Sequence, residues 1–236
     1  MRLLVLIDDP IIRNVFQKII KDKIKTDINV DYRVSYYEKT EETKGLKSIN
    51  IKKEYKNIIK NYDLIFSLCS QIFPKDLVDN VRCINFHFGI LPYACGVVPI
   101  TFSIANNIPT GFTIHLMNNK IDGGDIIYQE QIKNDIYETA KDIEIKCQKK
   151  LIEYLDKNIL NLLFGNYSSH KQSDNRKYFS VKDFKRLCNI DLNEKLTLLE
   201  FINKLRALQL KKSEAYFISD NNEKINISIS MKKETK

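Results

Sequence analysis

Short apolar runs alternate with helical patterns along the N-terminal part of the chain, and this alternation restricts the fold more than any other sequence feature. Strands are predicted over residues 3–7, 63–69 and 83–88, which are rich in Leu, Ile and Phe. After the first strand, Pro10 opens a run whose apolar residues recur at helical spacing through residue 24. Strands that alternate with helices indicate an α/β fold with a parallel sheet covered on both faces.

Weaker patterns fill the gaps between these elements. They predict a strand over 32–37, a polar loop over 39–53, and short helices near 58–62 and 76–81. A longer helix is predicted over 135–164, with Asp135 and Glu138 as its capping box and Gly165 as its stop.

Residues 82–129 concentrate the residues that shape loops and sites. Five of the seven glycines and two of the three histidines lie in this stretch. Alternating residues over 113–117 and 126–132 predict a hairpin whose turn contains Gly123 and Gly124. Because ligands of open α/β sheets bind beyond the carboxyl ends of the strands, function is expected here.

Polar side chains in this stretch are candidates for a site. Asn85 and His87 lie two residues apart in a predicted strand, so both side chains point to one face of the sheet. A polar edge satisfied by neighbouring backbone explains them equally well. Asp122 lies in the hairpin turn, where it could orient a histidine or simply form the turn. His115, between Ile114 and Leu116, is interpreted as structural.

The last part of the chain is predicted to be a small α+β region. After a polar linker at 167–177, Thr197 and Glu200 offer a capping box for a helix, and residues 215–219 and 225–229 alternate as a hairpin. We therefore expect two domains, over 1–167 and 168–236.

Composition excludes several classes of protein. With 43% hydrophobic and 29% charged residues the chain is an ordinary globular protein, and its net charge of +8 comes from lysines interleaved with acids. That distribution disfavours nucleic acid and membrane surfaces as binding partners, and it is compatible with an anionic ligand. The apolar run after Met1 is too short for a signal peptide or a membrane span, so a cytoplasmic location is expected. Five scattered cysteines without a C-x-x-C pair predict reduced thiols and no metal site.

Separated motifs in this order resemble those of a known family. Asn85-x-His87, Leu91-Pro92, Gly111-x-Thr113-x-His115 and Ile121-Asp122-x-Gly124 resemble the core of formyltransferases that use N10-formyltetrahydrofolate. Gln71–Lys75, Phe184–Leu192, Arg206–Leu208 and Ala215–Phe217 are similar to the sugar N-formyltransferases that modify dTDP-amino-dideoxyhexoses. The resemblance implies a Rossmann-like domain, a formyl donor and no metal, and a C-terminal region that supports a homodimer.

The resemblance also implies a role for each site residue. Asn85 would donate to the developing oxyanion, His87 would accept the proton of the amine or stabilise the oxyanion, and Asp122 would orient and charge-balance His87. The residues expected to bind the cofactor are Gln71, Ile72, Phe73, Asn118 and Ile121. Lys75 is expected to contact the pyrophosphate of the substrate.

The substrate implied by the resemblance is dTDP-4-amino-4,6-dideoxyglucose, with a product for a bacterial surface polysaccharide such as the lipopolysaccharide O-antigen. Two alternatives are kept: a dTDP-3-amino-3,6-dideoxyhexose N-formyltransferase, and a non-catalytic folate- or nucleotide-binding module. Phe88 replaces the usual proline of the family, and Cys95 replaces the usual arginine. The resemblance therefore does not determine the shape of the substrate loop or the choice of sugar. A glycinamide-ribonucleotide or methionyl-tRNA formyltransferase is disfavoured, because the chain lacks a Gly-rich loop after its first strand and is short at its C-terminus.

Overall fold

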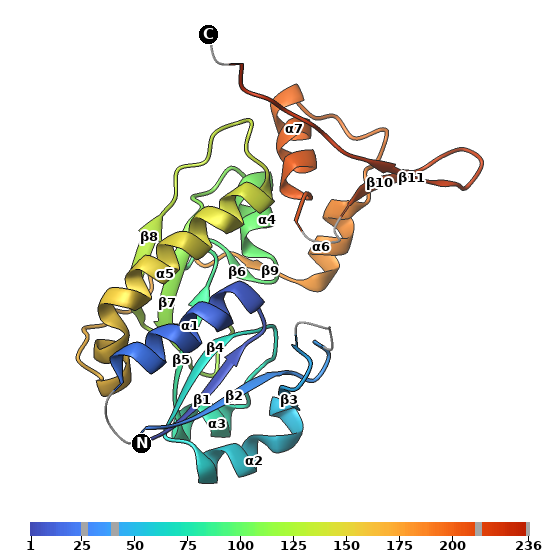
Figure 1. Cartoon of the computed structure of the whole chain (residues 1–236). Coiled ribbons are helices and arrows are strands. Elements are labelled where there is room, and N and C mark those ends of the chain that lie inside the picture. The colour runs from blue at the N-terminus through green and yellow to red at the C-terminus, as the bar shows by residue number, and fades with distance from the viewer. Residues whose placement is uncertain (25–27, 39–42, 211–213, 235–236) are drawn as a thin grey trace. The chain divides into compact units, whose positions relative to one another are not determined.

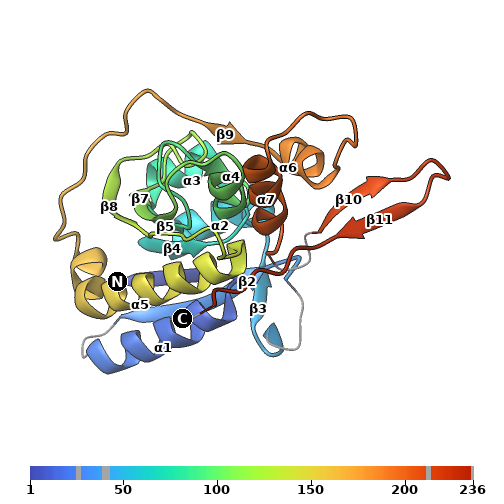
Figure 2. The same ribbon diagram turned by 90° about the horizontal axis from the view of Figure 1, so that it is seen from above.

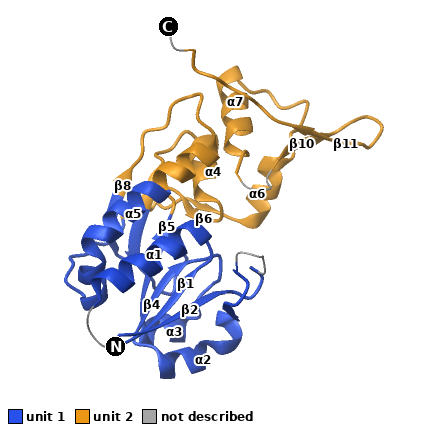
Figure 3. Ribbon diagram, viewed as in Figure 1, with its two compact units in different colours: residues 1–87, 113–129, 148–172 blue, residues 88–112, 130–147, 173–236 orange. Residues whose placement is uncertain are grey.

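The computed structural model describes residues 1–24, 28–38, 43–210 and 214–234 (Figure 1). The chain divides into two compact units, which are described separately (Figure 3). Unit 1 contains residues 1–87, 113–129 and 148–172, and unit 2 contains residues 88–112, 130–147 and 173–236. The domain boundary predicted at residue 168 stays a prediction.

Unit 1 is built on a seven-stranded sheet, mostly parallel as predicted. Its order is β3-β2-β1-β4-β5-β7-β8, in which β1 to β5 pair in parallel and β7 runs antiparallel to β5. The ends of β7 and β8 extend into unit 2. The strands are β1 (Arg2–Ile7), β2 (Asn29–Ser35), β3 (Lys47–Ile49), β4 (Leu64–Leu68), β5 (Arg82–His87), β7 (Gly111–Leu116) and β8 (Ile126–Gln131).

Helices cover both faces of this sheet (Figure 2). On one face, α1 (Pro10–Lys23) brings the Phe16 ring to 5.5 Å from that of Phe66 on β4, and Phe86 on β5 joins them. On the other face, Leu4 and Leu6 pack with residues of α2 (Ile51–Asn61) and α3 (Lys75–Asn80). Alternation along β5 therefore turns Phe86 toward α1 and leaves Asn85 and His87 on the opposite face, as predicted.

Several predicted boundaries are wrong. The strand predicted over 32–37 is β2, which begins at Asn29 and ends at Ser35. The loop predicted over 39–53 lies partly outside the described residues, but it contains β3, and α2 begins at Ile51 because Asn50 accepts a hydrogen bond from the Lys53 N–H. The long helix α5 (Ala140–Phe164) begins five residues later than predicted. Glu138 does accept from the Asp135 N–H, but that pair closes a turn, and Thr139 with Asp142 forms the cap.

Unit 2 contains the C-terminal region together with two segments from earlier in the chain. The predicted helix is α7 (Leu198–Ala207), with the expected Thr197–Glu200 capping box, and the predicted hairpin pairs β10 with β11. Among its apolar residues, Cys188, Ile190, Leu205, Leu208 and Ala215 form a small core. The other elements are α4 (Pro99–Ala105), β6 (Cys95–Gly96), β9 (Tyr178–Phe179), α6 (Val181–Cys188), β10 (Ala215–Ile218) and β11 (Lys224–Ile227).

The pairing of β6 with β9 accounts for the sequence at Cys95 and Gly96. Gly96 has φ +96°, and a Cβ atom there would lie 2.1 Å from the carbonyl oxygen of Phe179. Cys95 is fully buried and its thiol donates to the Pro92 carbonyl, so this position faces the interior of unit 2.

Among the described residues, no helix combines the length and the apolar character that a membrane span needs.

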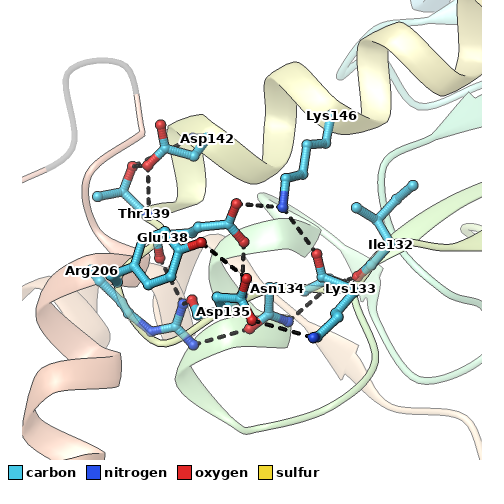
Figure 4. Close-up of polar contacts among 11 residues, drawn as sticks. Ile132, Lys133, Asn134, Asp135, Glu138, Thr139, Asp142, Lys146 and Arg206 are labelled. Carbon is cyan, nitrogen blue, oxygen red and sulfur yellow. Dashed lines mark hydrogen bonds and ion pairs between the residues drawn. The ribbon is translucent and has the colours of Figure 1, made fainter. Parts of the chain in front are cut away.

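A buried guanidinium joins α7 to the segment before α5 (Figure 4). Arg206 is 4% exposed, and its Nη1 donates to the carbonyls of Glu138 at 2.7 Å and Asp135 at 3.2 Å. Its Nε donates to Asn203 Oδ1 at 2.8 Å and its Nη2 to Asn134 Oδ1 at 3.2 Å. Burial lowers the pKa of Arg206. These bonds tie the C-terminal region to residues 134–138 within unit 2.

We expect Arg206→Met to lower the free energy of unfolding by about 1–3 kcal/mol, because it leaves the buried carbonyl of Glu138 without the N–H of Arg206. Urea unfolding followed by circular dichroism measures the change. Arg186→Met, at an exposed position on α6, is the matched control and should stay within about 0.5 kcal/mol of the wild type. Equal losses in the two variants would show that the bonds of Arg206 are not the cause.

Candidate active site

Antiparallel pairing of β5 with β7 brings the polar residues of the site together. Asn85 lies directly opposite His115, and His87 lies opposite Thr113. Residues that face each other across a strand pair share one face of the sheet, so Asn85, His87 and His115 point the same way. All three are at most 8% exposed, so their polar groups need partners inside the protein.

The partners of His115 define its protonation. Its Nδ1 lies 2.7 Å from the Leu116 carbonyl oxygen, which can only accept, so Nδ1 carries the hydrogen. In the neutral ring Nε2 is then an acceptor, and it receives the N–H of Asn85 Nδ2 at 3.2 Å. Burial lowers the pKa of His115 to about 4, although the nearby Asp122 carboxylate acts in the opposite direction. His115 is therefore neutral at pH 7 and fixes the orientation of the Asn85 amide.

Asp122 lies between the two histidines. Its Oδ1 is 3.7 Å from His87 Nδ1 and 3.7 Å from His115 Nε2, and its side chain is 11% exposed. Both distances are longer than a direct hydrogen bond, so the carboxylate acts on both rings mainly through its charge. The backbone at Asp122 has φ +50°, in the left-handed region that residues with a Cβ atom seldom adopt.

The hairpin turn that carries Asp122 is held by close packing. Gly124 approaches β7 so closely that a Cβ atom there would lie 1.8 Å from the Leu116 carbonyl oxygen. Asn118 braces the same turn, because its Oδ1 accepts from the Lys120 N–H and its Nδ2 donates to the Gly123 carbonyl. The position of the Asp122 carboxylate thus follows from contacts within unit 1.

This arrangement suits transfer of an acyl group to an amine. Asn85 offers an amide whose second N–H points away from His115, and such a donor can stabilise an oxygen that gains negative charge. His87 can accept a proton, and the charge that it would then carry lies beside Asp122. The donor, base and carboxylate predicted from the sequence are therefore brought together.

The side chain of Gln71 is engaged in the fold. Its Oε1 accepts from the Ile51 N–H at 2.8 Å, and its Nε2 donates to Ser35 Oγ and the Ile49 carbonyl, both at 3.0 Å. It thus joins β2, β3 and α2 to the segment after β4. Any contact of Gln71 with a cofactor would use its backbone.

The other predicted contact residues differ in exposure. Phe73 is buried in the core below α2 and α3, whereas Ile72 is 69% exposed. Asn118 and Ile121 lie in the Asp122 turn, with the side chain of Asn118 occupied by the turn itself. Lys75 is exposed and pairs with Asp79, and this ion pair raises the pKa of Lys75. The binding roles of these residues stay predictions.

His115, interpreted as structural from the sequence, contacts Asn85 and lies near Asp122. The alternation of Thr113 and His115 with Phe112 and Ile114 is the sequence signal for its place on this face. One residue of this site was not predicted. Gln172, assigned to a linker, donates to the backbone of the Asp122 turn. A contact fifty residues away along the chain leaves no local sequence pattern.

Comparisons with known proteins identify the family of this chain. Residues 38–158 match the Formyl transferase family, and residues 183–233 match the N-formyltransferase dimerization C-terminal domain. The dTDP-4-amino-4,6-dideoxyglucose formyltransferase of Mycobacterium bovis is 31% identical over 199 residues, which cover 80% of this chain and 82% of that protein.

Two solved structures are similar along most of the chain. A 4-N formyltransferase from Francisella tularensis is 36% identical with a TM-score of 0.91, covering 98% of each chain. An N-formyltransferase from Helicobacter canadensis, solved with folinic acid and dTDP-3-aminofucose, is 25% identical with a TM-score of 0.65, covering 87% of this chain and 79% of that one.

Stability should depend on pH through His115. The ordinary pKa of 6.5 applies to the unfolded chain and a pKa of about 4 to the folded one, so above 6.5 the group is neutral in both states. Below 6.5 the unfolded chain takes up the proton first. We therefore expect the free energy of unfolding to fall by up to about 1.4 kcal/mol per pH unit as pH decreases from 6.5 toward 4.

Urea unfolding at pH 7, 6 and 5 checks this expectation. His115→Gln removes the titration, so its stability should decrease less steeply than that of the wild type over this interval. His170→Gln, which replaces a histidine with an exposed side chain, is the matched control for the substitution itself. Parallel slopes for the wild type and His115→Gln would contradict a buried neutral His115.

Proposed function

Since this chain belongs to the formyl transferase family and is an enzyme that transfers formyl groups, we propose that it formylates the amine of dTDP-4-amino-4,6-dideoxyglucose, with N10-formyltetrahydrofolate as donor. The observation that carries the proposal is the cluster of Asn85, His87 and Asp122, which combines an N–H donor, a base and a carboxylate in one buried site. The product would be a formamido sugar nucleotide for a surface polysaccharide.

Similarity to named relatives supports the choice of a 4-amino sugar. The Mycobacterium bovis relative acts on a 4-amino-4,6-dideoxyglucose, and the Francisella tularensis relative is a 4-N formyltransferase. The Helicobacter canadensis relative, solved with a 3-amino sugar, is less similar in sequence and in structure. A dTDP-3-amino-3,6-dideoxyhexose is therefore the second candidate. Family membership weighs against a non-catalytic binding module.

The residues of the site can be assigned to the steps of the transfer. When bound, N10-formyltetrahydrofolate would supply the formyl group, and the proton that His87 takes from the amine would pass to the nitrogen from which that group departs. Asn85 donates the N–H that is not directed to His115 to the formyl oxygen, as negative charge develops there. His87 accepts the proton that the sugar amine loses when it forms the new C–N bond. Asp122 stabilises the resulting imidazolium, and His115 holds the Asn85 amide in its donating orientation.

The donor fits the residues around the site. A formyl donor needs an N–H donor near its oxygen and a base near the attacking amine, and this cluster contains both. The residues proposed to hold its pterin are the backbone of Gln71, Ile72 and Phe73 and the turn at Asn118 and Ile121. The named ligand of one relative, folinic acid, is itself a formylated tetrahydrofolate and supports this choice.

Lys75 is proposed to contact the pyrophosphate of the sugar nucleotide. Its ion pair with Asp79 is exposed on both sides, and exposed ion pairs contribute little free energy. A phosphate group can therefore compete with Asp79 for the ammonium at small cost.

A turnover assay tests the proposed reaction. We expect the purified protein to formylate dTDP-4-amino-4,6-dideoxyglucose with N10-formyltetrahydrofolate, and to act much more slowly on the 3-amino isomer. His87→Ala should lower kcat by roughly 10²- to 10³-fold, as is typical when one group that stabilises the transition state is removed. Release of tetrahydrofolate, followed by its absorbance, measures both rates.

A control variant distinguishes the loss of the His87 side chain from a loss of folded protein. His170→Ala changes an exposed histidine and should turn over within about twofold of the wild type. Turnover of only the 3-amino sugar would move the substrate and keep the mechanism. Absence of transfer to either sugar by folded protein would overturn the proposed substrate class.

We also propose that the enzyme is a homodimer formed through its C-terminal region. That region matches a dimerization domain and carries several exposed apolar side chains. They are Val181, Leu192, Leu198, Leu199, Ile218 and Ile225. Exposed apolar residues that gather in one small region are typical of protein interfaces.

Sedimentation equilibrium should give twice the 27.7 kDa of one chain. Leu198→Glu places a charge at a residue that is 74% exposed in the single chain, and it should shift the protein toward monomer. Ile11→Glu, at a comparably exposed apolar residue of α1, is the control and should leave the dimer intact. A monomeric wild type at micromolar concentration would refute the dimer.

A further inference from the structure

A segment after α5 runs beside the Asp122 turn within unit 1. His170 forms an antiparallel bridge with Ile126, in which the Ile126 N–H donates to the His170 carbonyl at 2.8 Å and the reverse bond measures 3.0 Å. Two residues further along an antiparallel pair, Gln172 comes opposite Gly124. The bridge therefore delivers the side chain of Gln172 to the turn that carries Asp122.

The amide of Gln172 contacts that turn at two points. Its Nε2 donates to the carbonyl of Asp122 at 2.8 Å and to the carbonyl of Gly124 at 2.7 Å. Carbonyl oxygens only accept, so the nitrogen of the amide must face them. Its Oε1 is buried and, within the described residues, has no hydrogen-bond partner. Within the part of the chain that the structure describes, the hydrogen bonds that orient this side chain therefore come from the turn.

The backbone of Asp122 needs such support. A residue with a Cβ atom at φ +50° persists only where its surroundings hold it. Asn118 secures Lys120 and Gly123 from inside the turn, and Gln172 secures Asp122 and Gly124 from outside it. The Asp122 carboxylate can stay 3.7 Å from both imidazoles only while the turn keeps this conformation.

We propose that Gln172 is a positioning residue, which acts on catalysis by holding the Asp122 turn and so placing the carboxylate between His87 and His115. This inference rests on the proposed role of Asp122 in formyl transfer. Among the described residues, the side-chain hydrogen bonds of Gln172 go to backbone carbonyls of the turn, so its effect should appear in the rate of the chemical step. A displacement of about 1 Å at such a group can lower a rate up to a hundredfold.

The variant Gln172→Met keeps the length of the side chain and removes its donor. We expect kcat to fall about ten- to a hundredfold, while KM for both substrates changes less than about threefold. Gln148→Met is the matched control: Gln148, on α5, is 7% exposed and donates at 2.8 Å to Oδ2 of Asp9, which is not part of the Asp122 turn. It should lose comparable stability and keep its kcat within about twofold.

A double-mutant cycle separates positioning from general destabilisation. In the Asp122→Asn background, adding Gln172→Met should lower kcat less than about twofold, because the group that it positions is already gone. An equal loss in both backgrounds, or no loss in the wild-type background, would overturn the proposal.

A second readout does not depend on turnover. The chain has three histidines, so their imidazole NMR signals can be assigned in the whole protein. The signals of His87 and His115 should move in Gln172→Met and stay in place in Gln148→Met. If they move while the wild type transfers no formyl group, the proposed substrate is wrong and the positioning role stands. Unmoved signals in Gln172→Met would refute that role.

Discussion

The pairing of β5 with β7 determines where each polar group of the site lies. Because the two strands are antiparallel, Asn85 faces His115 across the pair, and the polar residues of both strands share one face. A shift of one residue would turn Asn85 and His87 toward Phe16 and place Phe86 among the polar groups. The close approach of Gly124 to the end of β7 then brings Asp122 to the same face.

Neutral His115 connects this geometry to its electrostatics. The hydrogen bond from its Nδ1 to the Leu116 carbonyl selects one tautomer, and that tautomer requires a donor at Nε2. Asn85 supplies the donor and is oriented by doing so. A protonated His115 would have no acceptor to offer to Asn85, and burial makes that state unfavourable. A single backbone carbonyl therefore governs the hydrogen-bonding direction of an amide in the site.

The sequence was sufficient to predict the elements with strong periodicity and the residues grouped in motifs. The strands at the centre of the sheet, the helix after Pro10 and the capping box of α7 all follow from local patterns. The start of α5 was wrong because Glu138 satisfies the first half of a capping pattern, and only the backbone shows that it closes a turn. The side chain of Gln71 has the chemistry to bind a ligand, but it bonds to residues of β2 and β3 instead. These are tertiary contacts, which a local sequence pattern does not show. Gln172 was missed for the same reason.

The bridge between His170 and Ile126 has a consequence for the outer boundary of the sheet. Strand β8 is the last in the order, and the edge of such a strand exposes backbone groups that can recruit a further strand from another molecule. At Ile126 both of these groups are already paired with His170. The opposite edge is formed by β3, which is only three residues long. At Ile126 the bridge therefore prevents strand addition, and the β3 edge offers a partner strand only three residues to pair with.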